Sequence, residues 1–171
     1  LIQCVRKLSN DLYKDSGIDD ILQIICDFYQ AERCYVLDLD MDNKKANDIY
    51  EYGKRHDDIH IENMVRLCLE HMDLVNQFFE NQKSYYIEDV TREIPSTSPL
   101  YLSFIQQKIQ SIIVVPFMDN QKIKGVFAVD NPKQNYYQKD FLESLCFFIK
   151  TAMAREKEKT RLKNLSYVDS L

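Results

Sequence analysis

Apolar residues recur at helical spacing at both ends of the chain and at strand-like spacing between them. The first of these helical patterns predicts a helix over residues 1–15 with a short heptad seam. The seam consists of Leu1, Val5, Leu8 and Leu12. Ser16-Gly17 interrupts the apolar pattern of the first helix. A second amphipathic stripe over residues 18–29 then predicts another helix.

The middle of the chain mixes strand-like and helix-like segments. Residues 33–39 and 48–52 predict a hairpin around a polar turn, and residues 56–81 show helical spacing. A short strand is expected at 84–87. The segment 88–99 holds two prolines and two serines, so we expect a loop there, followed by a helix over 100–108.

The last third has the clearest pattern. Residues 111–117 and 123–129 predict two buried strands joined by a polar turn, and Gly125 within the second indicates close backbone packing or a bulge. Asp140 is expected to open a long helix. Hairpin-linked strands interspersed with helices predict an α+β fold in which helices flank a central antiparallel sheet.

Composition narrows the possible functions. The net charge of −5 argues against a nucleic-acid surface, and no apolar run reaches the roughly 20 residues that cross a bilayer. The three glycines stand too far apart for a phosphate-binding loop. The five cysteines are widely spaced and include no C-x-x-C pair, which is typical of free thiols in the cytoplasm.

The two C-terminal strands resemble those of a GAF domain. Ser111–Phe117 reads SIIVVPF and Lys124–Asn131 reads KGVFAVDN. The family's aromatic residue and acidic helix start follow at Tyr136 or Tyr137, Asp140 and Phe141. The resemblance implies about six antiparallel strands with a helical pair on one face and a ligand pocket on the other. It also implies a cytoplasmic sensory module that dimerises through its terminal helices.

The tail carries a second resemblance. Leu165–Leu171 reads LSYVDSL, which is similar to the linker that enters a GGDEF diguanylate cyclase domain. We therefore expect three parts: an N-terminal helix at 1–15, a sensory domain at 16–153, and an exit helix at 154–171 that leads to an output domain outside this chain.

The family's cyclic-nucleotide signature is only partly present. The matching positions read Asn131-Pro132, then Tyr136 and Asp140-Phe141, so a lysine is displaced and a glutamate is lost. These changes argue against binding of a cyclic nucleotide. The alternative is that Asn131 forms a turn and Asp140 caps the last helix.

A ligand pocket of the family type would be roofed by residues 88–101. We expect candidate ligand-binding groups there and at the signature positions: Tyr86, Thr91, Arg92, Thr97, Tyr101, Asn131 and Asp140. Arg92 is the residue best suited to an anionic ligand. The ligand and any cofactor stay unidentified, and a loop of this composition is equally expected of a surface connection.

Two chemical alternatives remain open at this point. His56 and His60, with Cys68 and His71 downstream, have a borderline spacing for zinc, although a metal site is not our prediction. Some GAF-fold proteins reduce methionine sulfoxide with clustered cysteines. The cysteines to consider here are Cys26, Cys34 and Cys146. Their apolar neighbours favour packing over reactivity.

The preferred hypothesis is a non-enzymatic, homodimeric GAF-type sensory domain that controls a C-terminal diguanylate cyclase in cyclic-di-GMP signalling. Its dimer seam would combine the N-terminal seam with apolar positions of the last helix, Leu145, Ile149 and Ala152. The alternative is a dimerisation spacer that binds no ligand, because 11 tyrosines and 9 phenylalanines are enough to fill a pocket.

Overall fold

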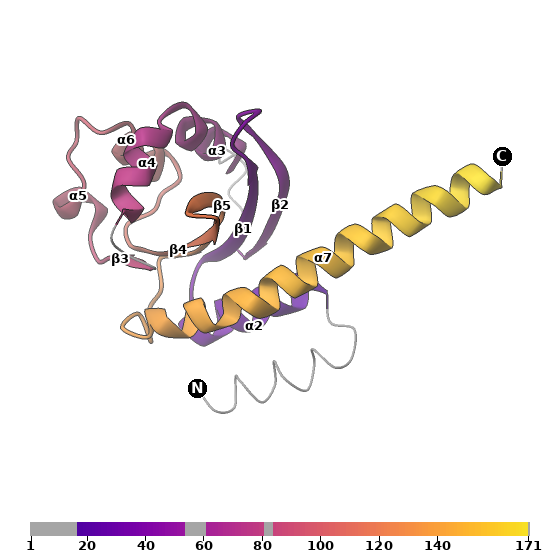
Figure 1. The fold of residues 1–171 in the computed structure, drawn as a ribbon. Coiled ribbons are helices and arrows are strands. Elements are labelled where there is room, and N and C mark those ends of the chain that lie inside the picture. Colours follow the sequence, from indigo (N-terminus) through magenta and orange to yellow (C-terminus); the bar gives the residue numbers. More distant parts are fainter. Residues whose placement is uncertain (1–16, 54–60, 81–83, 171) are drawn as a thin grey trace.

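The computed structural model describes residues 17–53, 61–80 and 84–170 (Figure 1). Along the chain the elements are α2 (Ile18–Tyr29), β1 (Arg33–Asp40), β2 (Lys45–Gly53), α3 (Ile61–Glu70), α4 (Met72–Phe79), β3 (Tyr85–Ile87), α5 (Val90–Glu93), α6 (Pro99–Gln106), β4 (Ile112–Asp119), β5 (Lys122–Asp130) and α7 (Lys139–Asp169).

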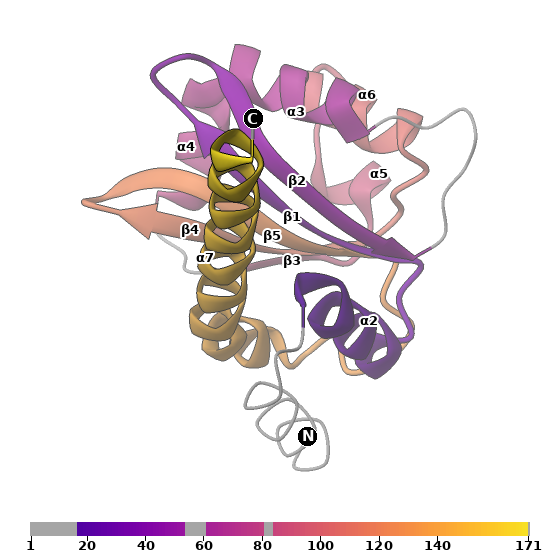
Figure 2. The ribbon, with the colours of Figure 1, turned by 90° about the vertical axis from the view of Figure 1, so that its right-hand side faces the viewer.

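The strands form one five-stranded sheet in the order β2-β1-β5-β4-β3, and all neighbours are antiparallel. Helices α2 and α7 lie on one face, and α3, α4 and α6 lie on the other (Figures 1 and 2). The predicted α+β fold with an antiparallel sheet between helices is therefore confirmed. The described residues supply five strands, where about six were expected.

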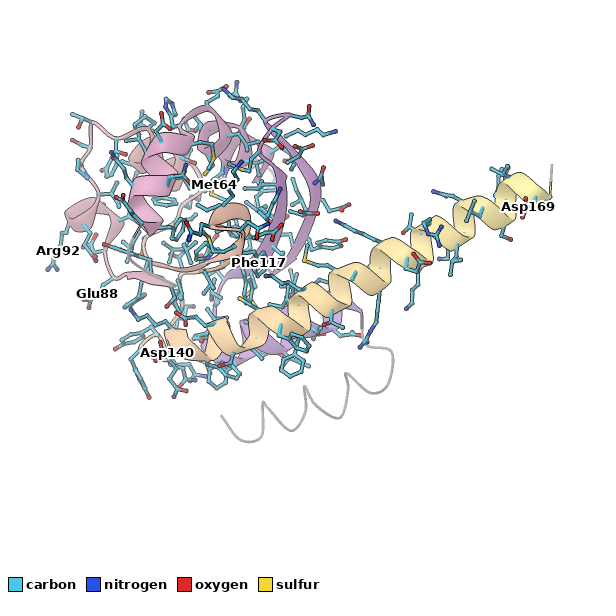
Figure 3. All side chains as sticks on the ribbon, in the orientation of Figure 1. Met64, Glu88, Arg92, Phe117, Asp140 and Asp169 are labelled. Carbon is cyan, nitrogen blue, oxygen red and sulfur yellow. The ribbon has the colours of Figure 1, made fainter. Side chains whose placement is uncertain are left out.

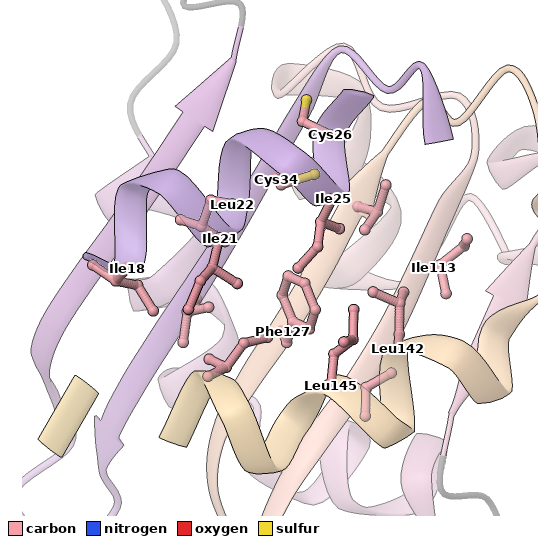
Figure 4. Packing of buried hydrophobic residues seen from close by; sticks show 14 of the residues in the cluster. Ile18, Ile21, Leu22, Ile25, Cys26, Cys34, Ile113, Phe127, Leu142 and Leu145 are labelled. Atoms are coloured by element: carbon pink, nitrogen blue, oxygen red, sulfur yellow. The ribbon is translucent and has the colours of Figure 1, made fainter. Parts of the chain in front are cut away.

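Each face of the sheet has its own hydrophobic core, because side chains along a strand point alternately to its two faces. In β1, Cys34 and Val36 pack toward α2 and α7, while Tyr35, Leu37 and Leu39 pack toward α3 and α6. Figure 4 shows the first core, in which α2 and α7 meet over the central strands. Both faces are covered, so the central strands are buried over most of their length and become exposed at the β4–β5 hairpin end, at Met118, Lys122 and Lys124.

Gly125 is where the centre of the sheet requires a glycine. A Cβ atom built at Gly125 would lie 2.3 Å from the carbonyl oxygen of Leu37 and 3.0 Å from the ring of Phe117. The β4–β5 register shifts between Phe117 and Met118, immediately after the pair Phe117–Gly125. The close approach expected from this glycine is thus confirmed, and it fixes how tightly β5 packs on β1.

Several elements differ in detail from the sequence predictions. The helical stretch expected over 56–81 is two helices within the described residues, with a break at His71. The expected loop at 88–99 contains the one-turn helix α5, whose first turn is capped by the Asp89 side chain accepting from the Thr91 N–H at 2.9 Å. The side-chain hydrogen bond of that cap could not be inferred from prolines and serines alone.

Helix α7 is the longest element, at 31 residues, and it leaves the domain (Figures 1 and 2). Its first half packs into the core through residues up to Met153, whereas residues 157–170 are exposed. None of the helices in the described ranges is long and apolar enough to cross a membrane.

Candidate ligand site

A small internal cavity lies between the sheet and the helices α3, α4 and α6. Its volume is about 60 Å³. The described side chains that line it are Tyr35, Leu37, Leu39, Met64, Cys68, Met72, Val75, Phe79, Leu100, Phe104, Ile112, Val114, Val126 and Ala128. The cavity lies on the sheet face opposite α2 and α7. The roof expected from residues 88–101 is not found among the described residues, because α3 and α4 cover the cavity and Leu100 is the one lining side chain from that range.

The described wall of the cavity is apolar and rich in sulfur. Met64, Cys68 and Met72 face the space from α3 and α4. Thioether side chains are flexible and polarisable, so they adapt to the shape of whatever fills the gap. Burial raises the pKa of the Cys68 thiol to about 11, which keeps it neutral at physiological pH. Such a wall suits an apolar ligand and offers little to a nucleotide.

The apolar sheet face ends in a buried polar cluster next to Tyr35. Arg33 donates from Nε to Asp130 Oδ2 at 2.8 Å, and its Nη2 lies 2.6 Å from the same oxygen. Nη1 of Arg33 donates to Gln107 Oε1 at 3.1 Å and to Glu51 Oε1 at 3.4 Å. The cluster joins β1, β2, β5 and the end of α6.

Burial sets the protonation behaviour of this cluster. It raises the pKa of Asp130 to about 6, although the neighbouring Arg33 charge acts in the opposite direction. The Oδ1 atom of Asp130 has no hydrogen-bond partner among the described residues. Burial also raises the pKa of Tyr35 well above its usual value. The Tyr35 hydroxyl donates to the Met64 sulfur at 3.7 Å, which connects the cluster to the cavity.

The ligand-binding residues predicted from the sequence do not converge on the cavity. Tyr86 belongs to the opposite core, where its ring stacks on Tyr136 with a 5.4 Å centroid separation. Thr91, Arg92 and Thr97 are exposed on α5 and the following loop. Tyr101 packs against the hydrophobic cluster around the cavity. The structure places these five residues at three separate locations.

Asn131 and Asp140, the two residues that match the cyclic-nucleotide signature, lie outside the cavity. Asn131 Oδ1 accepts from the N–H groups of Gln110 and Ser111 at 2.8 and 3.1 Å. Its Nδ2 donates to Glu32 Oε2 at 2.9 Å and to the Lys108 carbonyl at 3.0 Å. Asn131 thus braces the turn after β5. Asp140 is exposed in the first turn of α7 and, with Arg92, lies away from Met64 (Figure 3).

The dimer seam predicted for the last helix is wrong, because its residues are buried within the domain. Leu145, Ile149 and Ala152 are at most 2% exposed and pack against the domain's own sheet. The heptad spacing was real, but it reflects burial inside the domain, so these three side chains are closed to a second chain. The N-terminal seam of Leu1, Val5, Leu8 and Leu12 lies outside the described residues.

The metal hypothesis gains no support from the described residues. Cys68 lines the apolar cavity, and His56 and His60 lie outside the described ranges. Within those ranges, no three His, Cys, Asp or Glu side chains gather closely enough to hold a metal ion.

The three cysteines considered for reactivity are packed as hydrophobic side chains. Cys26 and Cys34 lie in the core between α2 and β1 (Figure 4), and burial raises the pKa of Cys34 well above its usual value. A hydrogen bond with Cys34 lowers the pKa of Cys26, while burial and nearby aspartates act against this. Burial raises the pKa of Cys146 to about 12. This environment favours the packing interpretation over a reactive thiolate.

The residues that do line the site were visible in the sequence as an amphipathic stripe. Met64, Cys68, Met72 and Val75 recur at helical spacing, and two of the four are methionines. A stripe of this kind predicts a buried helix face but does not distinguish a full core from one with a gap. The candidate residues predicted from the sequence are mostly polar, so they do not include these.

Comparison with known proteins gives the same fold. The family model described as GAF domain matches residues 15–154. The GAF domain of an Acinetobacter phosphoenolpyruvate-protein phosphotransferase superposes with a TM-score of 0.61 at 18% identity, over 94% of this chain and 96% of that chain. Part of a methyl-accepting chemotaxis protein gives 0.58 at 18% identity, over 90% and 97%.

A far-red absorbing dark-state structure with bound biliverdin gives a TM-score of 0.64 at 13% identity, over 90% of this chain and 99% of that chain. No curated protein matches the chain. The molecule is thus a small regulatory module with a helix-covered antiparallel sheet. The chain belongs to the GAF domain family.

Proposed function

We propose that this GAF domain is a ligand-gated sensory module that passes its state to an output domain through α7. The single observation that carries the proposal is the apolar cavity of about 60 Å³ between the sheet and the helices α3, α4 and α6. Interiors are normally close-packed, so a gap lined by adaptable side chains is a place where a small molecule gains binding energy.

The cavity supports a small apolar ligand. An apolar cavity of about 150 Å³ is known to take up benzene, so this one accepts a smaller molecule unless Met64 and Met72 move aside. A cyclic nucleotide would bury its phosphate without partners, and a tetrapyrrole such as biliverdin is far larger than the space. The incomplete nucleotide signature at Asn131 and Asp140 supports the same conclusion.

The output is proposed from the last helix. Residues 165–171 are similar to the entrance of a GGDEF domain, and α7 continues as one helix to Asp169. A diguanylate cyclase acts when two nucleotide-loaded domains meet, so the geometry of a dimeric connector is a plausible point of control. We call the exposed residues 157–170 the free half of α7. Leu162 and Leu165 lie on this half and supply apolar contacts for a parallel dimer.

Thermal unfolding against short alkanes, alcohols, thiols and aromatic fragments tests the proposal. A ligand at about 100 times its dissociation constant should stabilise the domain by roughly 2.7 kcal/mol. Ala128→Val, which adds methyl groups to the cavity floor, should abolish the shift. A flat response to the whole panel, with wild type and Ala128→Val indistinguishable, would reject ligand gating.

The second candidate is a dimerisation spacer that binds no ligand. The small size of the cavity favours it, because aromatic and aliphatic side chains already fill most of the space between the sheet and the helices α3, α4 and α6. Under this function the domain dimerises through α7 and the panel stays flat. The ligand panel therefore separates the two: both candidates dimerise, but only ligand gating requires a stabilising compound.

A further inference from the structure

Two aspartates face each other on the α7 side of the sheet. Asp38 of β1 and Asp48 of β2 are direct partners across the antiparallel pair. Like charges in this position repel and destabilise the pairing. The ammonium group of Lys157, from α7, contacts Asp38 Oδ2 and lies 3.4 Å from Asp48 Oδ2. One lysine thus offsets the repulsion of both carboxylates.

Lys157 stands at the point where α7 leaves the domain. The last core residue of the helix is Met153, one turn earlier, and the positions from 157 to 170 are exposed. The hydrogen bond with Asp38 raises the pKa of Lys157, so the lysine is fully charged at neutral pH. The contact with the two aspartates therefore holds the start of the free half of α7 against the hairpin of β1 and β2.

The same strand carries the floor of the cavity. Leu37 and Leu39, the neighbours of Asp38, line the cavity on the opposite face of the sheet. The β1–β2 register shifts between Asp38 and Leu39, so the strand is irregular at this point. A displacement of either leucine is transmitted to Asp38 through one peptide unit, because the backbone links them directly.

We propose that Lys157, Asp38 and Asp48 form an ionic latch that fixes the direction of the exit helix, and that occupancy of the cavity opens or closes this latch through β1. The trigger rests on the proposed sensory function, whereas the latch exists without a ligand. The latch has two arrangements, closed on the sheet or open, and a ligand shifts their populations only by its different affinity for each.

The latch is suited to switching because it is weak. The side chain of Lys157 is 47% exposed, whereas that of Asp38 is 17% exposed. Partly exposed ion pairs of this kind change an equilibrium by about two- to fivefold, and salt screens them. A contact of that size biases the helix without locking it.

Pulsed electron paramagnetic resonance on the intact chain tests the latch without ligand. Spin labels on unnatural amino acids at Asn47 and Lys163, both exposed, avoid the native cysteines, and dilution with unlabelled protein removes distances between chains. Lys157→Met should broaden and shift the distance distribution. Lys159→Met, a matched exposed lysine two residues further on, should leave it unchanged. Equal distributions in all three proteins would overturn the latch.

Two further experiments are needed. The first distinguishes loss of the latch from a folding defect, and the second tests whether the cavity affects the latch. Asp38→Lys combined with Lys157→Asp should restore the narrow distribution, and 1 M NaCl should broaden wild type but not Lys157→Met. Ala128→Val, which fills the cavity, should shift the distribution in wild type and not in Lys157→Met. If Ala128→Val has no effect in wild type, the coupling between the cavity and the latch is overturned, but the latch itself stands. A flat ligand panel would reject only the control of the latch by a ligand.

Discussion

Arg33 and Asp130 are direct partners across β1 and β5, and they are joined by an ion pair in which two guanidinium nitrogens meet one carboxylate oxygen at 2.8 and 2.6 Å. A slip of β1 by one residue would turn Arg33 into the core beneath α2 and leave Asp130 buried without its charge partner. The pair therefore specifies the register of the two central strands.

Removing the cation of this pair should destabilise the domain strongly. Arg33→Met leaves Asp130 buried and uncompensated, and breaking a buried ion pair in this way costs about 3–5 kcal/mol. Chemical denaturation at pH 7 measures the loss. Arg92→Met, which removes an exposed arginine, is the control and should change the free energy of unfolding by less than about 0.5 kcal/mol. Equal effects would contradict the structural role of Arg33.

The protonation of Asp130 should give the domain a distinctive pH dependence. Its pKa in the folded state is about 6, above the usual value of about 3.9 in an unfolded chain. The folded state then binds the proton more tightly, so the contribution of Asp130 to stability falls as pH rises from about 4 to 6. Two pKa units correspond to about 3 kcal/mol. Stability curves of wild type and Asp130→Asn should converge or cross within this window. Parallel curves would exclude the raised pKa.

Gly125 should not tolerate a side chain. Gly125→Ala places a Cβ atom against the Leu37 carbonyl, where backbone atoms must move, so we expect a loss of about 2 kcal/mol or more. Gly17→Ala is the matched control, because no atom lies within 4 Å of the new Cβ atom. Gly17 is the N-cap of α2, where alanine is less favourable than glycine, so the effect should be about 1 kcal/mol or less. Thermal unfolding of the two variants compares them directly.

Enlarging the cavity should create measurable ligand binding. Leu100→Ala removes a lining side chain that is 9% exposed, and such truncations cost about 2–5 kcal/mol. The larger space should then bind benzene, detected as a rise in melting temperature with benzene concentration. Leu102→Ala, on the exposed side of α6, should gain no such response. Benzene stabilisation in both variants would point to surface binding instead.

Self-association should depend on the free half of α7. Leu162→Glu with Leu165→Glu puts charges at exposed apolar positions and should shift a dimer toward monomer in sedimentation velocity. Lys159→Glu, in the same exposed region, should have little effect. If the wild-type chain is monomeric at high micromolar concentration, the proposal that α7 forms a dimeric connector is wrong.

The fold could be predicted largely from the chain, whereas the site could not. The apolar run in β1 and the stripe of α2 predict buried segments, and the resemblance at 111–117 and 124–131 added the family. The same periodicity misled at Leu145 and Ile149, because a heptad reads identically whether it faces a sheet or a second helix. The buried pair of Arg33 and Asp130 brings together residues 97 apart in sequence. No local pattern reports such a contact.

The residues that line the cavity were missed for a related reason. Polar loop residues such as Thr91 and Arg92 are exposed to solvent here, while the cavity is lined by methionine and leucine. The volume of this cavity depends on the side chains of six helices and strands together, so the sequence of any one segment does not predict it.

Helix α7 belongs to the core through Leu145 and Ile149, and its exposed half carries Leu162 and Leu165, the residues of the proposed connector. A straight helix turns by about 100° for each residue, so under the proposed function the length of α7 sets the angle between this domain and its output. One residue inserted near Thr160 would turn the connector face by about a quarter of a circle, whereas seven would return it to within about 20°. Fusions of this domain to a foreign output should therefore work at linker lengths spaced by sevens.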